Sequence, residues 1–221
     1  MSVERSVHDE LPEALVVDGP FDAHGHELWQ RGAYATQSRA SMLAARALDP
    51  QPGERVLDLC AAPGGKTTHL AALMNDEGVV VAVERHAGRA AALRRTCERM
   101  HVGNVTVQVA DAAAFESGEP FDRALVDPPC SGLGTLQGHP DLRWRVTPET
   151  IGALAESQRA MLAAANRALR PGGTLVYSTC TLSRRENEDL VASVGLQADA
   201  ERTLLPHQDG TDGFYIARMT A

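Results

Sequence analysis

The chain has 221 residues, enough for one α/β domain with a substantial core, and a second sizeable domain is not expected. Its 43% hydrophobic and 23% charged residues are ordinary for a soluble globular protein. The net charge of −8 argues against attraction of nucleic acid by the whole surface. It does not exclude a local basic face, because arginines cluster at positions 85, 89, 94, 95 and 99, at 143 and 145, and at 184 and 185.

The N-terminus has no apolar core of signal-peptide length, and no window approaches the ~20 apolar residues of a membrane span, so no membrane association is predicted. The spacing of the cysteines at positions 60, 97, 130 and 180 fits neither zinc knuckles nor a small disulfide framework. We therefore expect free thiols in a reducing cytoplasm. His24 and His26 have no third ligand nearby in the sequence, so no metal site is predicted.

Residues 1–36 are the least regular part of the chain and contain one strand-like string, LPEALVV. We predict that residues 37–221 form the main domain. It begins with a helical pattern over 38–48, which the prolines and glycine at 50–53 end. Strands then alternate with helices: strands at 55–59, 79–84, 105–110, 121–126 and 173–180, with helices at 66–74, 88–100, 148–169 and 184–194 between and after them. Shorter strand candidates follow at 203–205 and 212–219.

This alternation predicts an α/β fold with a doubly wound, mostly parallel seven-stranded sheet. In such sheets, ligands bind outside the carboxyl ends of the strands. A chemically reactive or polar residue follows each of the first five strands. They are Asp58 with the string CAAPGGK, Glu84, Asp111, Asp127 with Cys130, and Cys180. Their common position predicts that they form one site.

The glycine turn at residues 60–66 is neither a P-loop nor a dinucleotide fingerprint. Cys60 stands where GxxxxGK[ST] needs its first glycine, and PGGK does not supply GxGxxG. What remains is a tight turn at a helix N-terminus, followed one strand later by an acid that can bind ribose hydroxyls. An adenosine cofactor without a pyrophosphate meets these requirements. Asp111 would either accept a hydrogen bond from an adenine amine or cap a helix.

Two cysteines compete for the role of nucleophile. Cys130 lies in the rigid DPPCSG loop, where the prolines fix the backbone around Asp127. Cys180 ends a strand that we expect beside the one leading to Cys130. A strand cysteine is usually a small buried hydrophobe, yet two thiols and an acid at one sheet edge are able to do covalent chemistry.

The motifs LDLCAAPGGKTTHLA, DPPCSG, GHPDLRW, RPGGTLVYSTCTL, ENE and DGF, in this order, resemble the RNA 5-methylcytosine methyltransferases of the Sun/Nop2 group. The resemblance covers residues 32–219 and implies a Rossmann-like class I methyltransferase fold. It also implies S-adenosyl-L-methionine as cofactor, bound by Cys60, Ala61, Ala62, Pro63, Gly64, Gly65 and Lys66, with Glu84 on the ribose, Asp111 near the adenine and Asp127 near the methionine end.

The resemblance further implies that Cys180 attacks carbon 6 of a target cytosine and that Cys130 assists release. Chemically, Asp127 would stabilise charge on ring nitrogen 3, and Lys66 would lower the pKa of a neighbouring thiol. The HPDLRW block most resembles the bacterial branch of the family that modifies small-subunit ribosomal RNA, which implies that RNA as the substrate, with transfer RNA as another candidate. The base must be unstacked, and Arg143, Trp144 and Arg145 would stack on or clamp RNA; for Trp144 the alternative is a helix cap or packing role.

Family members usually carry a separate RNA-binding portion upstream, and residues 1–36 contain at most its last strand. We therefore expect a separate RNA-binding domain or partner to contribute to substrate selection. Residues 36–41, TQSRAS, also depart from the family's usual QDxSS. Two other functions are retained: methylation of an exocyclic amine, which needs no thiol, and a non-catalytic module that binds the cofactor or RNA.

Overall fold

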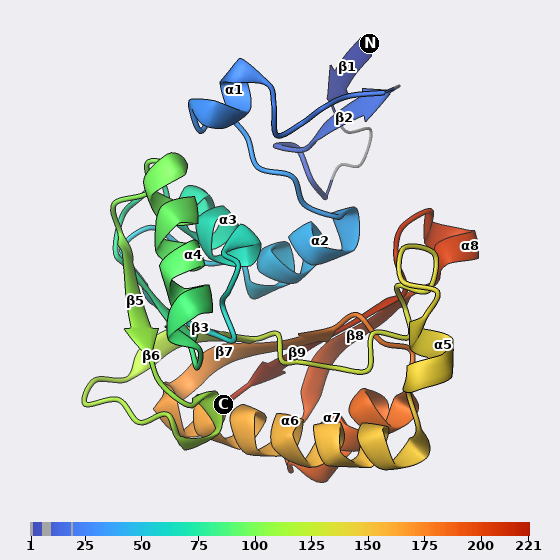
Figure 1. The fold of residues 1–221 in the computed structure, drawn as a ribbon. Coiled ribbons are helices and arrows are strands. Elements are labelled where there is room, and N and C mark those ends of the chain that lie inside the picture. The colour runs from blue at the N-terminus through green and yellow to red at the C-terminus, as the bar shows by residue number, and fades with distance from the viewer. Residues whose placement is uncertain (1, 6–9, 19) are drawn as a thin grey trace.

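The computed structural model describes residues 2–5, 10–18 and 20–221, and a seven-stranded sheet lies at its centre (Figure 1). The strand order is β5-β4-β3-β6-β7-β9-β8. All neighbouring pairs are parallel except the two that involve β9. The strands are β3 (Arg55–Leu59), β4 (Val79–Glu84), β5 (Val105–Val109), β6 (Phe121–Val126), β7 (Leu169–Thr179), β8 (Ala198–Leu204) and β9 (Phe214–Thr220). The predicted doubly wound, mostly parallel sheet is confirmed.

Helices cover both faces of this sheet, because apolar side chains alternate along the buried strands. Leu57 and Leu59 of β3 point toward α6 (Pro148–Ala168) and α7 (Glu188–Ser193), which pack on one face. Val56 points to the other face, where α2 (Arg39–Leu48) and α3 (Gly65–Leu73) pack. Leu93 of α4 (Ala87–Arg99) packs on that same face against Ala82.

Chain order reverses direction between β3 and β6. From β3 the chain proceeds to β4 and β5 on one side, and from β6 it proceeds to β7 on the other. The connections that leave the carboxyl ends of the neighbouring strands β3 and β6 therefore run in opposite directions, which creates a switch point, where open α/β sheets bind ligands.

Several short elements were not predicted: β1 (Ser2–Arg5), α1 (Glu27–Gln30), α5 (Leu142–Arg145), α8 (Pro206–Asp209) and the 3-10 turn η1 (Ala112–Ala114). The predicted helix over 184–194 is wrong in its continuity. It divides into the 3-10 turn η2 (Arg184–Glu186) and α7, with Asn187 between them at φ −116° and ψ −106°.

The N-terminal segment packs against the α2, α3 and α4 side of the sheet. The string LPEALVV, residues 11–17, overlaps β2 (Leu15–Asp18), which pairs with β1. Leu11 is buried in the core beside α2, and Glu13 accepts hydrogen bonds from Arg46 and pairs with His69 at 2.8 Å. Within the part of the chain that the structure describes, no helix has the length and apolar character needed to cross a membrane.

Candidate active site

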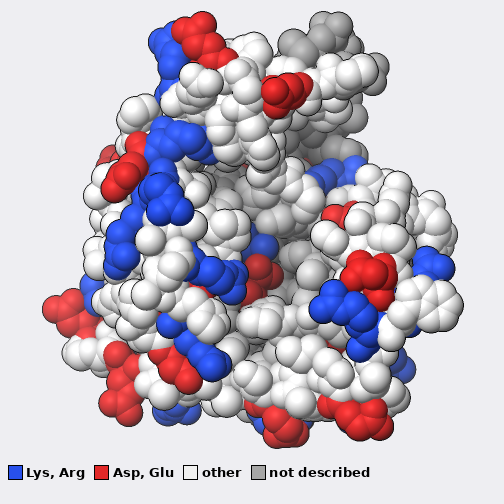
Figure 2. All heavy atoms as spheres, in the orientation of Figure 1, with Lys and Arg blue, Asp and Glu red and all other residues white. Residues whose placement is uncertain are grey.

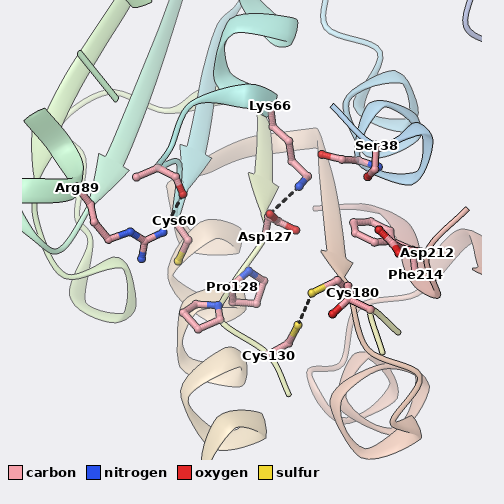
Figure 3. A pocket seen from close by; sticks show the side chains of 14 residues that line it. Ser38, Cys60, Lys66, Arg89, Asp127, Pro128, Cys130, Cys180, Asp212 and Phe214 are labelled. Carbon is pink, nitrogen blue, oxygen red and sulfur yellow. Dashed lines mark hydrogen bonds and ion pairs between the residues drawn. The ribbon is translucent and has the colours of Figure 1, made fainter. Parts of the chain in front are cut away.

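A cavity of ≈ 420 Å³ opens at the carboxyl ends of β3, β6 and β7, at the switch point of the sheet. It contains six of the predicted site residues, which come from three separate strand ends and face one hollow (Figure 3). The full lining is Ser38, Ser41, Cys60, Ala62, Lys66, Arg89, Asp127, Pro128, Pro129, Cys130, Thr135, Cys180, Asp212 and Phe214.

The turn at residues 60–66 forms one wall, shaped by its backbone. Cys60 has a left-handed φ of +67° directly after β3, and Gly64 has φ +110° at the start of α3. A Cβ at Gly64 would come within 2.7 Å of Leu93 on α4, so glycine lets the two helices approach. A Cβ at Gly65 would meet nothing within 4 Å. The turn is therefore packed on its inner side and open at Gly65.

Glu84, at the end of β4, is almost fully buried. Its carboxylate accepts a hydrogen bond from the His86 amide at 2.8 Å and lies 3.5 Å from the guanidinium of Arg89. Arg89 also donates to the Ala62 carbonyl at 2.8 Å, and it lines the cavity. Arg89 was not predicted as a site residue, although it belongs to the arginine cluster on α4.

Asp111 does not line the cavity. Its side chain accepts a hydrogen bond from the Ala113 amide at 3.0 Å and caps η1, which was the second of the two roles considered for it. The predicted contact of Asp111 with an adenine amine stays a prediction.

Lys66 and Asp127 form an ion pair of 2.7 Å inside the cavity (Figure 3). The other carboxylate oxygen of Asp127 accepts a hydrogen bond from Ser178 at 2.9 Å. The ring of Phe214 lies 5.5 Å from the Lys66 ammonium. Lys66 thus has Asp127 as its direct partner.

The Sγ atoms of Cys130 and Cys180 are 3.2 Å apart, and both thiols are free. A hydrogen bond from Cys130 lowers the pKa of Cys180, while burial and the charge of Asp127 act against this and the charge of Lys66 reinforces it. The same bond, together with burial, raises the pKa of Cys130. Cys180 is therefore the more acidic of the two thiols and Cys130 the less acidic.

The third cysteine of the site, Cys60, has a different environment. Burial raises its pKa to about 12, and the charge of Asp58 acts in the same direction. Its Sγ lies 3.6 Å from the Met161 sulfur. Cys60 is accordingly a packing residue rather than a second nucleophile.

A buried hydrogen-bond network joins the loops that carry the two close thiols. The Glu186 carboxylate is fully buried and accepts from the Ser131 amide at 2.9 Å, the Ser131 hydroxyl at 2.5 Å and the Gln158 amide at 3.0 Å. The Ser131 hydroxyl also lies 2.7 Å from that of Thr181. Since Ser131 follows Cys130 and Thr181 follows Cys180, this network fixes one thiol relative to the other.

Asn187 and Gly134 complete this wall. The Asn187 side chain accepts from the Thr179 hydroxyl at 2.6 Å and donates to the Thr181 carbonyl at 2.9 Å, so it contacts both sides of Cys180. The Gly134 amide donates to the Cys180 carbonyl at 2.9 Å. A Cβ at Gly134 would lie 1.9 Å from the Gly213 carbonyl oxygen, so only glycine fits there. The ENE string was noticed in the sequence, but its positioning contacts were not predicted.

Comparison with known proteins identifies relatives over most of the chain. A family model described as 16S rRNA methyltransferase RsmB/F matches residues 45–200. The probable ribosomal RNA small subunit methyltransferase B of Synechocystis is 40% identical over 234 residues, covering 95% of this chain and 52% of that protein. The ribosomal RNA small subunit methyltransferase F of Shewanella amazonensis is 44% identical over 164 residues, covering 72% of this chain and 35% of that protein.

A solved structure, NSun6 from Pyrococcus horikoshii with SFG, is 34% identical and superimposes with a TM-score of 0.84, covering 89% of this chain and 55% of that one. The chain spans about half the length of the methyltransferase B relatives it matches.

Proposed function

This chain belongs to the 16S rRNA methyltransferase RsmB/F family, and on that premise we propose that it methylates carbon 5 of a cytosine in ribosomal RNA. The family match confirms the resemblance to the Sun/Nop2 group, and the sheet is that of the Rossmann-like class I methyltransferase fold. The observation that carries the cytosine assignment is the thiol pair, 3.2 Å apart and unequal in proton affinity. Methylation of an exocyclic amine needs no such pair.

S-adenosylmethionine supplies the methyl group in this family, and the side of the cavity formed by the turn at residues 60–66 and Arg89, here called the nucleotide wall, fits it. The turn at residues 60–66 opens at Gly65 beside the N-terminus of α3, where backbone amides point outward. Glu84, at the end of the adjacent strand, would accept hydrogen bonds from ribose hydroxyls, with Arg89 beside it. Asp127 would lie at the methionine end, and Asp111 would bind the adenine after giving up its bond to Ala113.

Cys180 would begin the reaction. Carbon 5 of cytosine is too electron-poor to accept a methyl group directly, so a thiolate must first add to carbon 6. The Cys180 sulfur forms that bond with its electron pair, and the ring becomes an enamine whose carbon 5 attacks the methyl group. Charge developing on ring nitrogen 3 is met by a proton from the Lys66 and Asp127 pair, which lies in the same cavity.

Cys130 would end the reaction. Once Cys180 is a thioether, it no longer holds a negative charge beside Cys130, so Cys130 can lose its proton to solvent. The Cys130 thiolate then accepts the proton on carbon 5. The carbon 6 to sulfur bond breaks, its electrons return to Cys180, and nitrogen 3 returns its proton. The thiol pair is restored with the proton again on Cys130.

The two thiols are distinguished by trapping. With labelled S-adenosylmethionine and total RNA, Cys130→Ala is expected to accumulate a covalent protein and RNA adduct that survives denaturing electrophoresis. Cys180→Ala should form no adduct, and its methyl transfer should fall on the order of 10³-fold or more. The opposite pattern would exchange the two roles. Transfer that persists in Cys180→Ala would favour an exocyclic amine as the target.

Calorimetry with S-adenosylmethionine separates a third function. A chain that binds the cofactor but transfers no label to RNA would be a binding module. Mapping of the labelled nucleotide in total RNA then identifies the substrate, with small-subunit ribosomal RNA expected and transfer RNA as the other candidate. We also propose that a separate RNA-binding portion or partner contributes to the choice of position, since the relatives are about twice as long as this chain.

A further inference from the structure

The short helix α5 carries Trp144, whose exposed fraction of 83% is the largest among the exposed large hydrophobic residues. Trp29, the other tryptophan, is half-buried and lies 3.6 Å from the guanidinium of Arg99. Across residues 2–5, 10–18 and 20–221, Trp144 makes no ring stacking or cation-π contact. The structure thus removes the packing role that the sequence left open for this side chain.

The helix is attached to the loop that carries Cys130. Gly132 in this loop has φ +71°, and a Cβ there would lie 2.9 Å from Leu142 of α5. Thr135, which lines the cavity, donates to the Gly132 carbonyl through both its amide and its hydroxyl, at 2.9 and 2.8 Å. The His139 amide in turn donates to the Thr135 carbonyl at 2.8 Å. These contacts therefore connect the loop that carries Cys130 to the segment leading into α5, the helix that carries Trp144.

Positive charge flanks the tryptophan. Arg143 is exposed and has no ion pair with any described residue. Arg145 is exposed and pairs with Asp141 at 3.0 Å. This surface pair contributes little stability, so Arg145 can leave Asp141 and bind another anion. Figure 2 shows Lys and Arg side chains on both sides of the central hollow, over α4 and over α5. On α5 and at its N-cap, two arginines flank Trp144 and one acid, Asp141, pairs with Arg145, although the net charge of the chain is −8.

We propose that Trp144 is the stacking platform for an unpaired RNA base next to the target cytosine, with Arg143 and Arg145 contacting its phosphates. The proposal rests on the proposed function and specifies how the substrate is held. A base that leaves its stack to reach Cys180 exposes the face of its neighbour, and an indole ring can cover that face. Aromatic rings flanked by cations are the usual means of binding single strands without sequence preference.

The test uses a short single-stranded RNA with one central cytosine and its fully paired duplex. Trp144→Ala should weaken binding of the single strand about 10-fold, in keeping with the loss of one base stack. Binding of the duplex, which has no free base face, should change far less. The matched control is Trp29→Phe, which replaces the other tryptophan and should leave RNA affinity unchanged.

Trp29→Phe also leaves Trp144 as the sole tryptophan and so provides a direct optical readout. Its fluorescence should be quenched by the single strand and much less by the duplex. Should Trp29→Phe fold poorly, the same signal is obtained as the difference between the wild-type chain and Trp144→Phe. The double variant Arg143→Gln, Arg145→Gln should reduce the salt dependence of binding, because two phosphate contacts are lost.

The outcomes separate this proposal from the proposed function. If the wild-type chain binds RNA and transfers methyl groups while Trp144→Ala binds the single strand equally well, the platform is disproved and the enzyme assignment stands. The exposed side chain of Trp144 would then indicate a protein-docking surface. If the wild-type chain neither binds RNA nor labels it, both fail. The platform is supported if the single strand quenches the fluorescence of Trp144 in Trp29→Phe and if Trp144→Ala keeps the wild-type affinity for S-adenosylmethionine.

Discussion

The two walls of the cavity each lie over a buried carboxyl group, and they use it differently. On the nucleotide wall, Asp58 accepts a hydrogen bond from the Thr67 hydroxyl at 2.6 Å, and burial raises its pKa to about 7 despite that bond. On the side of the cavity that carries Cys130 and Cys180, here called the thiol wall, Glu186 accepts from the Ser131 amide, the Ser131 hydroxyl and Gln158. The first wall is shaped mainly by its backbone turn, the second by a network of side chains.

This difference fits the task of each wall. A cofactor held by several backbone amides and a carboxylate tolerates small displacements of any one group. In the proposed reaction one sulfur attacks a ring carbon and the other removes a proton from the neighbouring carbon, and these two atoms do not tolerate such displacement, because misplacement of about 1 Å can cost two orders of magnitude in rate. Hydrogen bonds from Ser131 and Gln158 to the fully buried Glu186, together with the contact between the Ser131 and Thr181 hydroxyls, connect the loops that carry Cys130 and Cys180, whose Sγ atoms are 3.2 Å apart.

The largest effect is expected from Glu186→Ala, which removes the acceptor of the thiol wall. The buried Ser131 amide loses its partner and a cavity remains, so the free energy of unfolding should fall by about 2–4 kcal/mol, as measured by urea denaturation. Adduct formation with RNA should slow while calorimetric affinity for S-adenosylmethionine is retained. Glu156→Ala, on the exposed surface of α6, is the matched control and should stay within about 0.5 kcal/mol.

A positioning role for Glu186 also predicts a change in thiol chemistry. Loosening of the two loops weakens the hydrogen bond from Cys130, so the pKa of Cys180 should rise and its alkylation should require a higher pH. Glu186→Gln keeps the size and one acceptor of the side chain and should restore part of the wild-type profile. A destabilised variant whose alkylation profile is unchanged would reduce Glu186 to a purely structural residue.

The sequence predicted the sheet and the strand-end residues, because both leave local signals. The alternation of apolar strands with helices predicted a mostly parallel sheet. The strings around Cys60, Cys130 and Cys180 had recognisable spacing. Glu186 was not predicted as a positioning residue, since its partners Ser131 and Gln158 are 55 and 28 residues away. Such contacts exist only after the chain has folded.

Short elements show the same limit. Within the predicted helix over 184–194, the side chain of Asn187 binds Thr179 and Thr181, and its backbone is not helical, so tertiary contacts override local propensity. Helix α5 has one turn and no periodic signal, yet it displays Trp144. Arg89 had a visible signal, the arginine cluster on α4, but nothing local distinguished it from its exposed neighbours.

A smaller, pH-dependent effect should come from Asp58→Asn on the nucleotide wall. The folded-state pKa of Asp58, about 7, lies above its ordinary value of 3.8, so its stabilising contribution is complete at low pH and is lost as pH rises through 7. Between about pH 5 and pH 8, the unfolding free energy of the wild-type chain should fall by about 2–3 kcal/mol relative to the variant.

The quantity to compare at each pH is the difference in unfolding free energy between the wild-type chain and Asp58→Asn. His69 has a lowered pKa, mainly through burial, and its stabilising contribution decreases as pH falls, which opposes the Asp58 trend in the wild-type curve. Because His69 is present in both proteins, its contribution cancels when the curves are subtracted. A difference that stays constant over this pH range would mean that Asp58 is ionised in the folded protein throughout.

The smallest effect is expected from Arg89→Gln, which tests how far the nucleotide wall depends on side chains at all. Arg89 is 54% exposed, and it contacts the Glu84 carboxylate and the Ala62 carbonyl. Loss of the Arg89 guanidinium should reduce the calorimetric affinity for S-adenosylmethionine about three- to tenfold, which corresponds to one or two partly solvated hydrogen bonds. The free energy of unfolding should not change. Arg95→Gln, also exposed on α4, is the control and should leave cofactor affinity unchanged. If Arg89→Gln binds the cofactor as the wild-type chain does, the backbone turn alone organises this wall, and the contrast with the thiol wall becomes sharper still.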